Sequence, residues 1–385
     1  MPNYATPGVY RDEVFETPGA KPRTGVPVFI GYASAPAPVN QARALTLWSE
    51  FGRYFGARPD SYLAPAVRGF FENGGTLCQV LRLDDQLPAA DALKSGLAEA
   101  AGLDAVDLLC APDIMRPRGQ EGLPPDPQEA RAMQTAVLEY CDRLGDRFAI
   151  LDSLPGAATA GMEVALQQRH GLTGTSGALY FPWVRVADGL GLVPPCGHVA
   201  GVYARSDLRI GLHKAPANEV LYGVLDLEIN LTDAQQANLN PEGVNCLRAF
   251  PGRGIRVWGA RTLSNDPAWR YVNVRRLFLG IGRWIERRFP PLAFEPHDAR
   301  LWARIHRELN VYLTGLYRIG ALKGQTAREA FYVKCDAETN PKEVREEGKV
   351  VTELGLAPSV PNEFVVIRIV HGTSGVSLTG LANAV

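Results

Sequence analysis

The stretch GIRVWGARTLSNDPAWRYVNVRRLFLGIGRWIERRF, residues 254–289, changes in physical character at its midpoint. Its first part, 255–262, is rich in strand-forming residues and has glycine before and within it, which predicts a β-strand that another backbone approaches closely. The Asn-Asp-Pro sequence at 265–267 can cap and start a helix, and the prolines at 290–291 end it. We therefore expect a strand that runs almost directly into a long helix.

The predicted helix has two different faces. One face is apolar and consists of Val272, Leu277, Leu279, Ile281, Trp284, Ile285 and Phe289. The other is basic and consists of Arg275, Arg276, Arg283, Arg287 and Arg288. A strand followed by such a helix is typical of a junction between domains. The arginines could bind phosphate, but a net charge of -1 favours a solvated or interfacial face.

Composition indicates an ordinary globular protein. The 385 residues suffice for two domains, and 46% hydrophobic with 21% charged residues is usual for a soluble fold. A net charge of -1 argues against a chain that wraps nucleic acid, and no apolar run reaches the length that crosses a bilayer. The start MPNYATPGVYRDE lacks the apolar core of a signal peptide, so we expect folding in the cytoplasm.

The cysteines are scattered along the chain without close pairs. This spacing predicts buried free thiols rather than a metal or redox site. They are Cys78, Cys110, Cys141, Cys196, Cys246 and Cys335.

Residues 1–24 predict an extended arm rather than the start of a domain. Their strand formers are Val9, Tyr10, Val14 and Phe15, but prolines flank them and no tight turn provides a hairpin partner. A frayed terminus is the usual interpretation of such a segment. The β-prone centre favours addition of the arm, as a strand, to a neighbouring chain.

Strand and helix patterns alternate between residues 25 and 262. Strands are predicted at 26–33, 77–83, 106–111, 148–152 and 178–186, and helices at 45–56, 61–73, 89–101, 126–144 and about 199–206. Strands separated by helices of this length predict an α/β domain with a mostly parallel sheet covered on both faces. After the junction, a helix is predicted at 298–316 and strands at 330–335 and 363–370, followed by a Gly-rich apolar tail.

Fragments of subtilisin-type serine protease motifs are present. Residues 174–178 match G-T-S-x-A around Ser176, residues 371–373 match H-G-T, and Asp152 begins a D-[ST]-G motif. The chain order would be Asp, Ser, His, whereas the topology of subtilisins fixes a different order. Leu154 also stands where the last motif needs glycine. Two glycine-serine turns and a surface aspartate explain these fragments better than a catalytic triad.

Motifs for cofactors and metals are missing from the sequence. It has no G-x-x-x-x-G-K-[ST], and the lone G-x-G pairs at 252–254 and 280–282 lack a third glycine. The histidines show neither H-x-x-x-H nor H-E-x-x-H spacing. We therefore expect no catalytic site, no cofactor and no metal.

Several segments are similar, in the same order, to segments of contractile tail sheath proteins. YATPGVYRDEV resembles the N-terminal arm of that family, and FFENGGTLCQVLRL resembles its helix, double glycine and strand. AGVYARSDLRIGLHKAPAN, LTDAQQANLNPEGVNCLR and GIRVWGARTLSNDPAWRYVNVRRL are similar to three further segments, and GALKGQTAREAFYVKCDAETNP and LAPSVPNEFVVIRI resemble its C-terminal domain. The resemblance covers residues 4 to 370, although 103–195 share only the αβ pattern. The length is similar to the compact sheaths of R-type pyocins and extracellular contractile injection systems.

The resemblance implies an outer α/β domain with subtilisin-like architecture and an inner α+β domain completed by terminal arms. It divides the chain into an N-terminal arm at 1–24, an outer domain at 25–262, an inner domain at 263–370 and a C-terminal arm at 371–385. Arms of neighbouring protomers would add strands to a third protomer's sheet. The residues implied in these arm contacts are Val9, Tyr10, Val14, Phe15, Phe364, Val366, Ile367 and Ile369.

The resemblance also implies a structural, non-enzymatic subunit that polymerises helically around an inner tube and contracts to drive the tube through a target envelope. The implied partners are further copies of the chain, the tube protein, and baseplate and terminal cap proteins, without nucleic acid or membrane insertion. Such a phage tail or tail-like virion component would assemble in the bacterial cytoplasm and could be released from the cell. A subtilisin-like serine hydrolase and a non-contractile sheath are the alternatives.

Contacts with a tube must be given up when a sheath widens. Exposed ion pairs, worth roughly 0 to 1 kcal/mol each, suit this requirement. We hypothesise that Arg318, Lys323 and Arg328 face an acidic tube surface. The arms, in contrast, are expected to be unfinished β-structure that only a polymer completes, so a chain that folds its own ends back onto itself would argue against a sheath.

Overall fold

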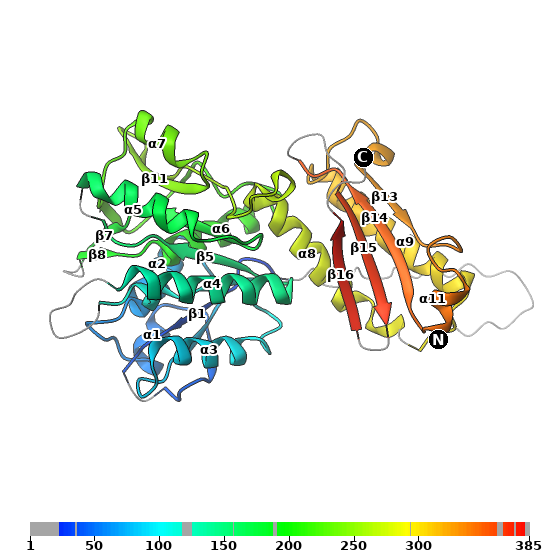
Figure 1. The fold of residues 1–385 in the computed structure, drawn as a ribbon, viewed down its shortest axis with the longest axis horizontal. Coiled ribbons are helices and arrows are strands. Elements are labelled where there is room, and N and C mark those ends of the chain that lie inside the picture. Colours follow the sequence, from blue (N-terminus) through cyan, green and yellow to red (C-terminus); the bar gives the residue numbers. More distant parts are fainter. Residues whose placement is uncertain are drawn as a thin grey trace, which may run out of the picture.

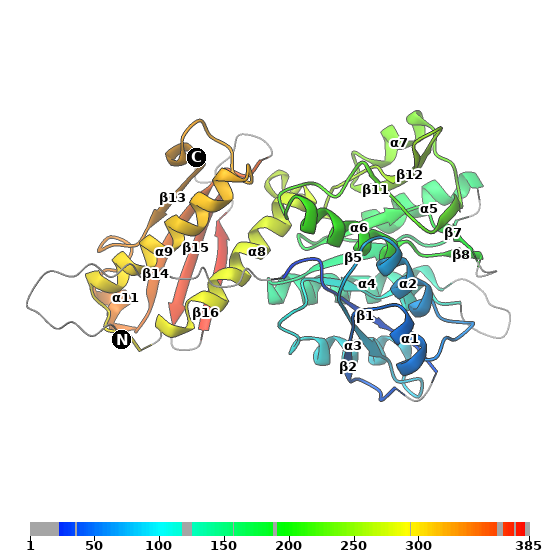
Figure 2. The same ribbon diagram turned by 180° about the vertical axis from the view of Figure 1, so that it is seen from behind.

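The computed structural model describes residues 23–34, 37–117, 125–156, 158–187, 191–292, 294–359, 365–372 and 375–381. Two lobes lie side by side, and helix α8 (Val272–Arg288) runs between them (Figures 1 and 2). The strand predicted before this helix is β12 (Gly254–Val257), which is shorter than expected. The Asp266 side chain caps the short 3₁₀ turn η2 (Pro267–Trp269), so α8 itself begins later than the Asn-Asp-Pro sequence suggests.

The larger lobe contains a nine-stranded sheet. Its strand order is β2-β3-β1-β4-β5-β6-β11-β12-β9, and the six strands from β3 to β11 are parallel neighbours. The strands are β1 (Pro27–Gly31), β2 (Ala42–Leu45), β3 (Cys78–Arg82), β4 (Leu108–Cys110), β5 (Phe148–Asp152), β6 (Gly177–Phe181), β9 (Glu219–Val220), β11 (Val244–Phe250) and β12. The predicted, mostly parallel sheet is therefore confirmed.

Helices cover both faces of this sheet because its central strands are apolar on both sides. In β1, Val28 and Ile30 pack into one core and Phe29 packs into the other, and all three are fully buried. The first core also takes side chains from α3 (Ala89–Ala100), α4 (Pro127–Leu144) and α5 (Ala158–His170). The second takes side chains from α1 (Ser49–Tyr54), α2 (Leu63–Glu72) and α6 (Cys196–Arg209).

Further short elements complete the larger lobe. A three-stranded sheet has the order β10-β7-β8. The elements are η1 (Pro112–Met115), β7 (Val184–Val186), β8 (Gly191–Val193), β10 (Val224–Leu227) and α7 (Asp233–Leu239).

The smaller lobe packs helices on an antiparallel sheet. The order of the sheet is β13-β14-β15-β16, and α8 and α9 (Ala299–Arg318) share a core with it. Trp284 of α8 stacks on Tyr312 of α9 with ring centroids 3.9 Å apart. The remaining elements are η3 (Pro290–Leu292), α10 (Ala327–Ala330), β13 (Phe331–Lys334), α11 (Lys342–Glu346), β14 (Val350–Leu356), β15 (Val365–Gly372) and β16 (Gly375–Leu381).

The C-terminal segment differs from the expectation. Strand β15 continues past residue 370 to Gly372, and β16 pairs with it from Gly372↔Gly375 to Val366↔Leu381. The expectation that the C-terminal end lacks a β partner in its own chain is therefore wrong for residues 375–381. The physical reason is that strand-forming residues close behind β15 can pair locally, because a short connection costs little loop entropy. The N-terminal arm, 1–22, lies outside the described residues.

Local predictions failed where side chains or proline interrupt a pattern. The predicted helix 45–56 starts late, at α1, because the Glu50 carboxylate accepts bonds from the N–H groups of Thr46 and Leu47. The predicted strand 178–186 is split into β6 and β7 around Pro182, which has no N–H to donate.

The prediction for the cysteines is confirmed, since all six are buried and free. Among the described residues, no helix is both long and apolar enough to cross a membrane.

Candidate functional site: the domain junction and the strand edges

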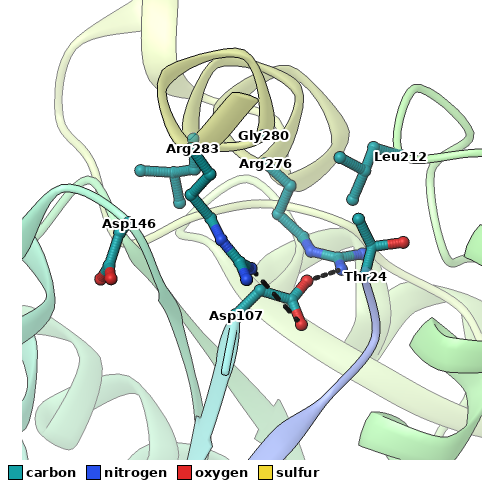
Figure 3. A pocket seen from close by; sticks show the side chains of 8 residues that line it. Thr24, Asp107, Asp146, Leu212, Arg276, Gly280 and Arg283 are labelled. Carbon is teal, nitrogen blue, oxygen red and sulfur yellow. Dashed lines mark hydrogen bonds and ion pairs between the residues drawn. The ribbon is translucent and has the colours of Figure 1, made fainter. Parts of the chain in front are cut away.

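The junction between the lobes is built around a buried arginine of α8. The guanidinium group of Arg276 donates to both carboxylate oxygens of Asp207, at 2.9 Å and 2.6 Å. It also donates to Asp107 at 3.2 Å (Figure 3). The side chains of Arg276 and Asp207 are only 2% and 1% exposed. Because α8 belongs to the smaller lobe's core and both aspartates belong to the larger lobe, this cluster joins the two.

Burial and charge act in opposite directions on this cluster. Burial works against the Arg276 charge, but Asp207 and Asp107 outweigh it and raise the pKa of Arg276 above its ordinary value. Burial raises the pKa of Asp207, and Arg276 opposes that rise. The two-pronged geometry supports a charged pair, since it satisfies both carboxylate oxygens at once. Removal of either partner would leave a buried charge without compensation.

The start of the described chain is tied to the same cluster. The N–H groups of Gly25 and Val26 donate to Asp107 at 3.0 Å and 2.6 Å. Gly25 has a φ of +71°, and a Cβ atom there would lie 2.5 Å from the Cα atom of Ala204 in α6. Only glycine fits this position. The described part of the chain therefore begins at the junction.

The junction encloses almost no free space. The gap between Thr24, Asp107, Asp146, Leu212, Arg276, Leu279, Gly280 and Arg283 measures about 10 Å³ (Figure 3). Such a volume holds about one water molecule. The junction is thus a packed contact rather than a ligand pocket.

The other arginines of α8 also contact protein. Arg283 donates to the carbonyl oxygens of Asp104 and Ala105 at 3.1 Å and 3.2 Å, and Arg287 donates to the Asp104 carbonyl as well. Arg275 donates to the hydroxyl of Ser176 at 3.0 Å and 3.1 Å. On the opposite side, Arg288 pairs with Glu308 of α9 at 2.6 Å. The interfacial interpretation of this basic face is confirmed.

The structure separates the fragments of the protease motifs. Asp152 ends β5 and pairs with Tyr180, whereas Ser176 directly precedes β6. Along the strand direction, Asp152 is therefore four residues, about 13 Å, away from the level of Ser176. His371 is in β15 of the other lobe. These three residues do not form a triad.

The sequence analysis was wrong to expect a surface aspartate here, because Asp152 is buried at the end of an apolar central strand and has a structural role. Its carboxylate accepts a 2.7 Å bond from the N–H of Cys196, the first residue of α6, where a negative charge is stabilised by the helix dipole. Burial raises the pKa of Asp152 to about 7, and its bonds to Cys196 oppose the rise.

The residues predicted for arm contacts lie mostly beyond the described chain. Val9, Tyr10, Val14, Phe15 and Phe364 are outside the described residues. The other three, Val366, Ile367 and Ile369, belong to β15, between β14 and β16. The arm contacts therefore stay a prediction.

The three basic residues predicted to face a tube lie between the end of α9 and β13. Arg318 is the last residue of α9, and Lys323 and Arg328 follow it in the connection to the sheet. All three are exposed, and none has an ion-pair partner within the described part of the chain. Two exposed apolar residues nearby were not predicted: Val311 of α9, which is 70% exposed, and Ile319 directly after α9, which is 50% exposed. Both residues lie outside the repeat of buried apolar positions in the predicted helix, and this was the signal in the sequence that they could be exposed.

The described residues thus form an α/β lobe and a smaller lobe of helices on an antiparallel sheet, joined by buried charges. The comparisons give the family. The description "Phage tail sheath protein central domain" matches residues 97–263, and "Phage tail sheath C-terminal domain" matches residues 264–371. The chain belongs to the phage tail sheath protein family.

Solved sheath structures match most of the chain. The helical sheath of the anti-feeding prophage in its contracted state is 30% identical, with a TM-score of 0.75, and covers 94% of this chain and 98% of that chain. The contracted sheath complex of the extracellular contractile injection system PVC is 27% identical, with a TM-score of 0.74, over 94% of this chain and 96% of that chain. The crystal structure of a sheath tail protein from Desulfitobacterium hafniense shares the fold at 11% identity and a TM-score of 0.65, over 94% and 99% of the two chains.

Curated tail sheath proteins match a smaller part of the chain. The protein of Enterobacteria phage T4 is 26% identical over 197 residues, which are 49% of this chain and 29% of the relative. The protein of Burkholderia phage BcepMu is 28% identical over 232 residues, which are 56% of this chain and 45% of the relative. The matches thus span less than half the length of these relatives.

Proposed function

We propose that the chain is the repeating structural subunit of a contractile sheath, which polymerises helically around an inner tube and shortens to drive that tube forward. The observation that carries the proposal is the match to a helical sheath solved in a contracted state, which covers 98% of that sheath chain. The subunit acts as a mechanical part rather than as an enzyme. The separation of Asp152, Ser176 and His371 supports this role over that of a serine hydrolase.

The terminal segments connect the subunits. In the chain described here, β16 pairs with its own β15. The same backbone groups can pair with the β15 of a neighbouring subunit, because an exchange of identical strands between protomers preserves every ladder bond. Residues 1–24 form a second connecting strand, and within the C-terminal arm 371–385 it is β16 that is exchanged. The outer and inner domains are the units 25–262 and 263–370, and the outer one has the subtilisin-like arrangement.

The remaining partners follow from the geometry of a sheath. The exposed residues Arg318, Lys323 and Arg328 face an acidic tube surface through weak, reversible ion pairs. Further contacts at the two ends of the polymer connect it to baseplate and cap proteins. The particle assembles in the bacterial cytoplasm as a phage tail or tail-like structure, and release from the cell brings it to its target.

Electron microscopy of the purified chain tests the proposal. We expect helical tubes from the full chain and soluble, folded subunits from a chain that lacks residues 1–22, because the described fold begins after that segment. Co-expression with the tube protein should give longer, narrower sheaths that shorten on triggering. A full chain that stays monomeric at all concentrations would refute the proposal, and labelling of Ser176 by a serine-reactive probe would favour the hydrolase.

A further inference from the structure

Three cations surround one buried carboxylate beside the edge strand β9. Glu219, in this strand, is 9% exposed. Its carboxylate oxygens lie 2.5 Å from Nη2 of Arg209, 3.8 Å from Nζ of Lys214 and 4.0 Å from Nη2 of Arg205. Within the described part of the chain, no other carboxylate comes within 4.0 Å of these three side chains. Three positive charges against one negative charge leave a surplus of two.

Backbone carbonyls hold two of the cations in place. Nζ of Lys214 donates to two carbonyl oxygens of the segment 215–217, at 2.6 Å and 3.1 Å. The terminal nitrogens of Arg205 donate to the carbonyl of Asn73 at 2.9 Å and to that of Val220 at 2.6 Å. Because a carbonyl group carries no net charge, these bonds orient the cations without neutralising them. The surplus charge is therefore fixed in position.

Arg209 is the accessible member of the cluster. Its side chain is 58% exposed, whereas that of Arg205 is 21% exposed. Nη2 of Arg209 donates to Glu219 at 2.5 Å, and among the described residues its Nε and Nη1 groups have no partner. A lysine ammonium has more donors than the two that Lys214 uses for carbonyl bonds. An anion that approaches from the solvent thus meets unused donors on two side chains.

Two more arginines lie next to the cluster. Nη1 of Arg256 donates to the carbonyl oxygen and to Oδ1 of Asn218, at 2.8 Å and 3.2 Å, and Nη2 of Arg253 donates to the same Oδ1 at 3.4 Å. Asn218 directly precedes Glu219. Neither arginine has an ion-pair partner in the ranges that the structure describes. Both therefore add to the positive potential around β9.

Burial and neighbouring charges act in different directions on the cluster. Burial lowers the pKa of Lys214, Glu219 opposes this change, and Arg209 lowers the pKa further. Burial also lowers the pKa of Arg205, on which the same two neighbours act in the same directions. One carboxylate thus does not compensate for the burial and mutual repulsion of these cations. A bound anion would favour their charged forms.

We propose that Arg205, Arg209 and Lys214 form a binding site for a phosphate-class dianion, which enters beside Arg209. A chloride ion or a single carboxylate would balance only one of the two surplus charges. A phosphate group with two negative charges balances both, and its oxygens accept the charged hydrogen bonds that guanidinium and ammonium groups donate. Leu208 and Ile210, which flank Arg209, are 79% and 43% exposed, and this apolar surface admits a phosphate group carried by a lipid as well as a free one. Such binding goes beyond the proposed function and does not depend on sheath assembly.

Equilibrium dialysis of the full chain against radiolabelled pyrophosphate tests the site, whether the subunits are free or assembled. At constant ionic strength set with chloride, we expect saturable binding at a single site per chain. Arg209→Gln should weaken this binding by about tenfold or more, because it removes charged hydrogen bonds. Arg307→Gln is the matched control, since Arg307 of α9 is also exposed and has no ion-pair partner within the described residues. No saturable binding by the unmodified chain, or equal weakening by both variants, would overturn the proposal.

Glu219→Gln separates ligand binding from a merely structural role of the cations. Loss of this carboxylate raises the surplus from two to three charges. The folded variant should therefore bind pyrophosphate more tightly, by about fivefold or more. Circular dichroism shows whether the variant folds; if it does not, Arg209→Gln and Arg307→Gln, which change exposed side chains, decide. Unchanged or weaker binding by folded Glu219→Gln would overturn the proposal.

Vesicles distinguish the two sources of the phosphate group. The full chain is floated with phosphatidylcholine vesicles that either contain or lack phosphatidic acid. Flotation that requires phosphatidic acid and is lost in Arg209→Gln assigns the site to a lipid phosphate. Pyrophosphate binding without such flotation assigns it to a free anion. If neither ligand binds, the proposal is overturned.

Discussion

Replacement of Arg276 by methionine tests how strongly the junction holds the two lobes together. Methionine keeps an extended side chain but removes the charge, so Asp207 loses its bonds of 2.6 Å and 2.9 Å while it stays 1% exposed. Loss of one partner from a buried ion pair costs about 3–5 kcal/mol. This loss is a large share of the about 5–15 kcal/mol by which a typical domain is stable.

Urea unfolding of the full chain, monitored by tryptophan fluorescence and circular dichroism, measures this loss of stability. Arg288→Met is the matched control on the same helix. Its ion pair with Glu308 is equally short, at 2.6 Å, but the arginine is 40% exposed. We therefore expect a cost of only about 0–1 kcal/mol for the control. The difference between the two variants isolates the effect of burial.

The defect of Arg276→Met should also depend on pH. Burial already raises the pKa of Asp207, and loss of Arg276 removes the charge that opposes this rise. When the folded-state pKa of a carboxyl group lies above its unfolded value, ionisation of that group destabilises the folded state. This cost to the free energy of unfolding is absent below the unfolded pKa of about 4 and complete above the folded pKa. The difference in the free energy of unfolding between wild type and Arg276→Met should therefore narrow as the pH falls towards 4. A loss no larger than that of Arg288→Met, or a gap that widens in acid, would refute the reasoning.

Three further predictions follow from single contacts. In thermal unfolding, Gly25→Ala should destabilise the chain by more than about 1 kcal/mol, because the new Cβ atom would lie 2.5 Å from the Cα atom of Ala204. Gly315→Ala is the control: this glycine of α9 has open space around it, so the substitution should stabilise the chain by about 0.5–1 kcal/mol. Asp152→Asn should raise stability at pH 8, and the gain should vanish towards pH 4, because burial raises the pKa of Asp152 to about 7. An unchanged pH profile would contradict this. Co-sedimentation with the tube protein should weaken, most clearly at low salt, when glutamate replaces all of Arg318, Lys323 and Arg328; unchanged binding would reject the tube contact.

The sequence predicted elements whose pattern is local. The two-sided helix α8 was predictable because its apolar positions repeat with the helical period and prolines end it. The partners of its arginines were not, since Arg276 meets Asp207 and Asp107 across 69 and 169 residues of chain. A basic helix face indicates that acidic groups or water lie opposite. It does not say where in the chain those acidic groups are.

The strands that the sequence analysis missed depend on their neighbours. β14 carries Gly355 in its interior, which weakens any strand pattern. The structure explains this residue, since a Cβ atom there would lie 2.0 Å from the ring of Tyr332 on β13. The glycine therefore makes room for a cross-strand aromatic contact. Likewise, Asn340 reads as a turn residue in the sequence, and only the structure shows that its carboxamide bonds the N–H and the carbonyl of Val351.

The contacts of the chain fall into two groups of unequal strength. Within the subunit, α8 is fixed to the larger lobe by desolvated charges that are costly to separate. At the surface, the basic residues near the end of α9 are exposed, so their ion pairs are screened and easily exchanged. When a polymer of such subunits changes shape, the weaker group must yield first. Shortening should therefore move whole subunits against one another while the junction around Arg276 keeps its geometry.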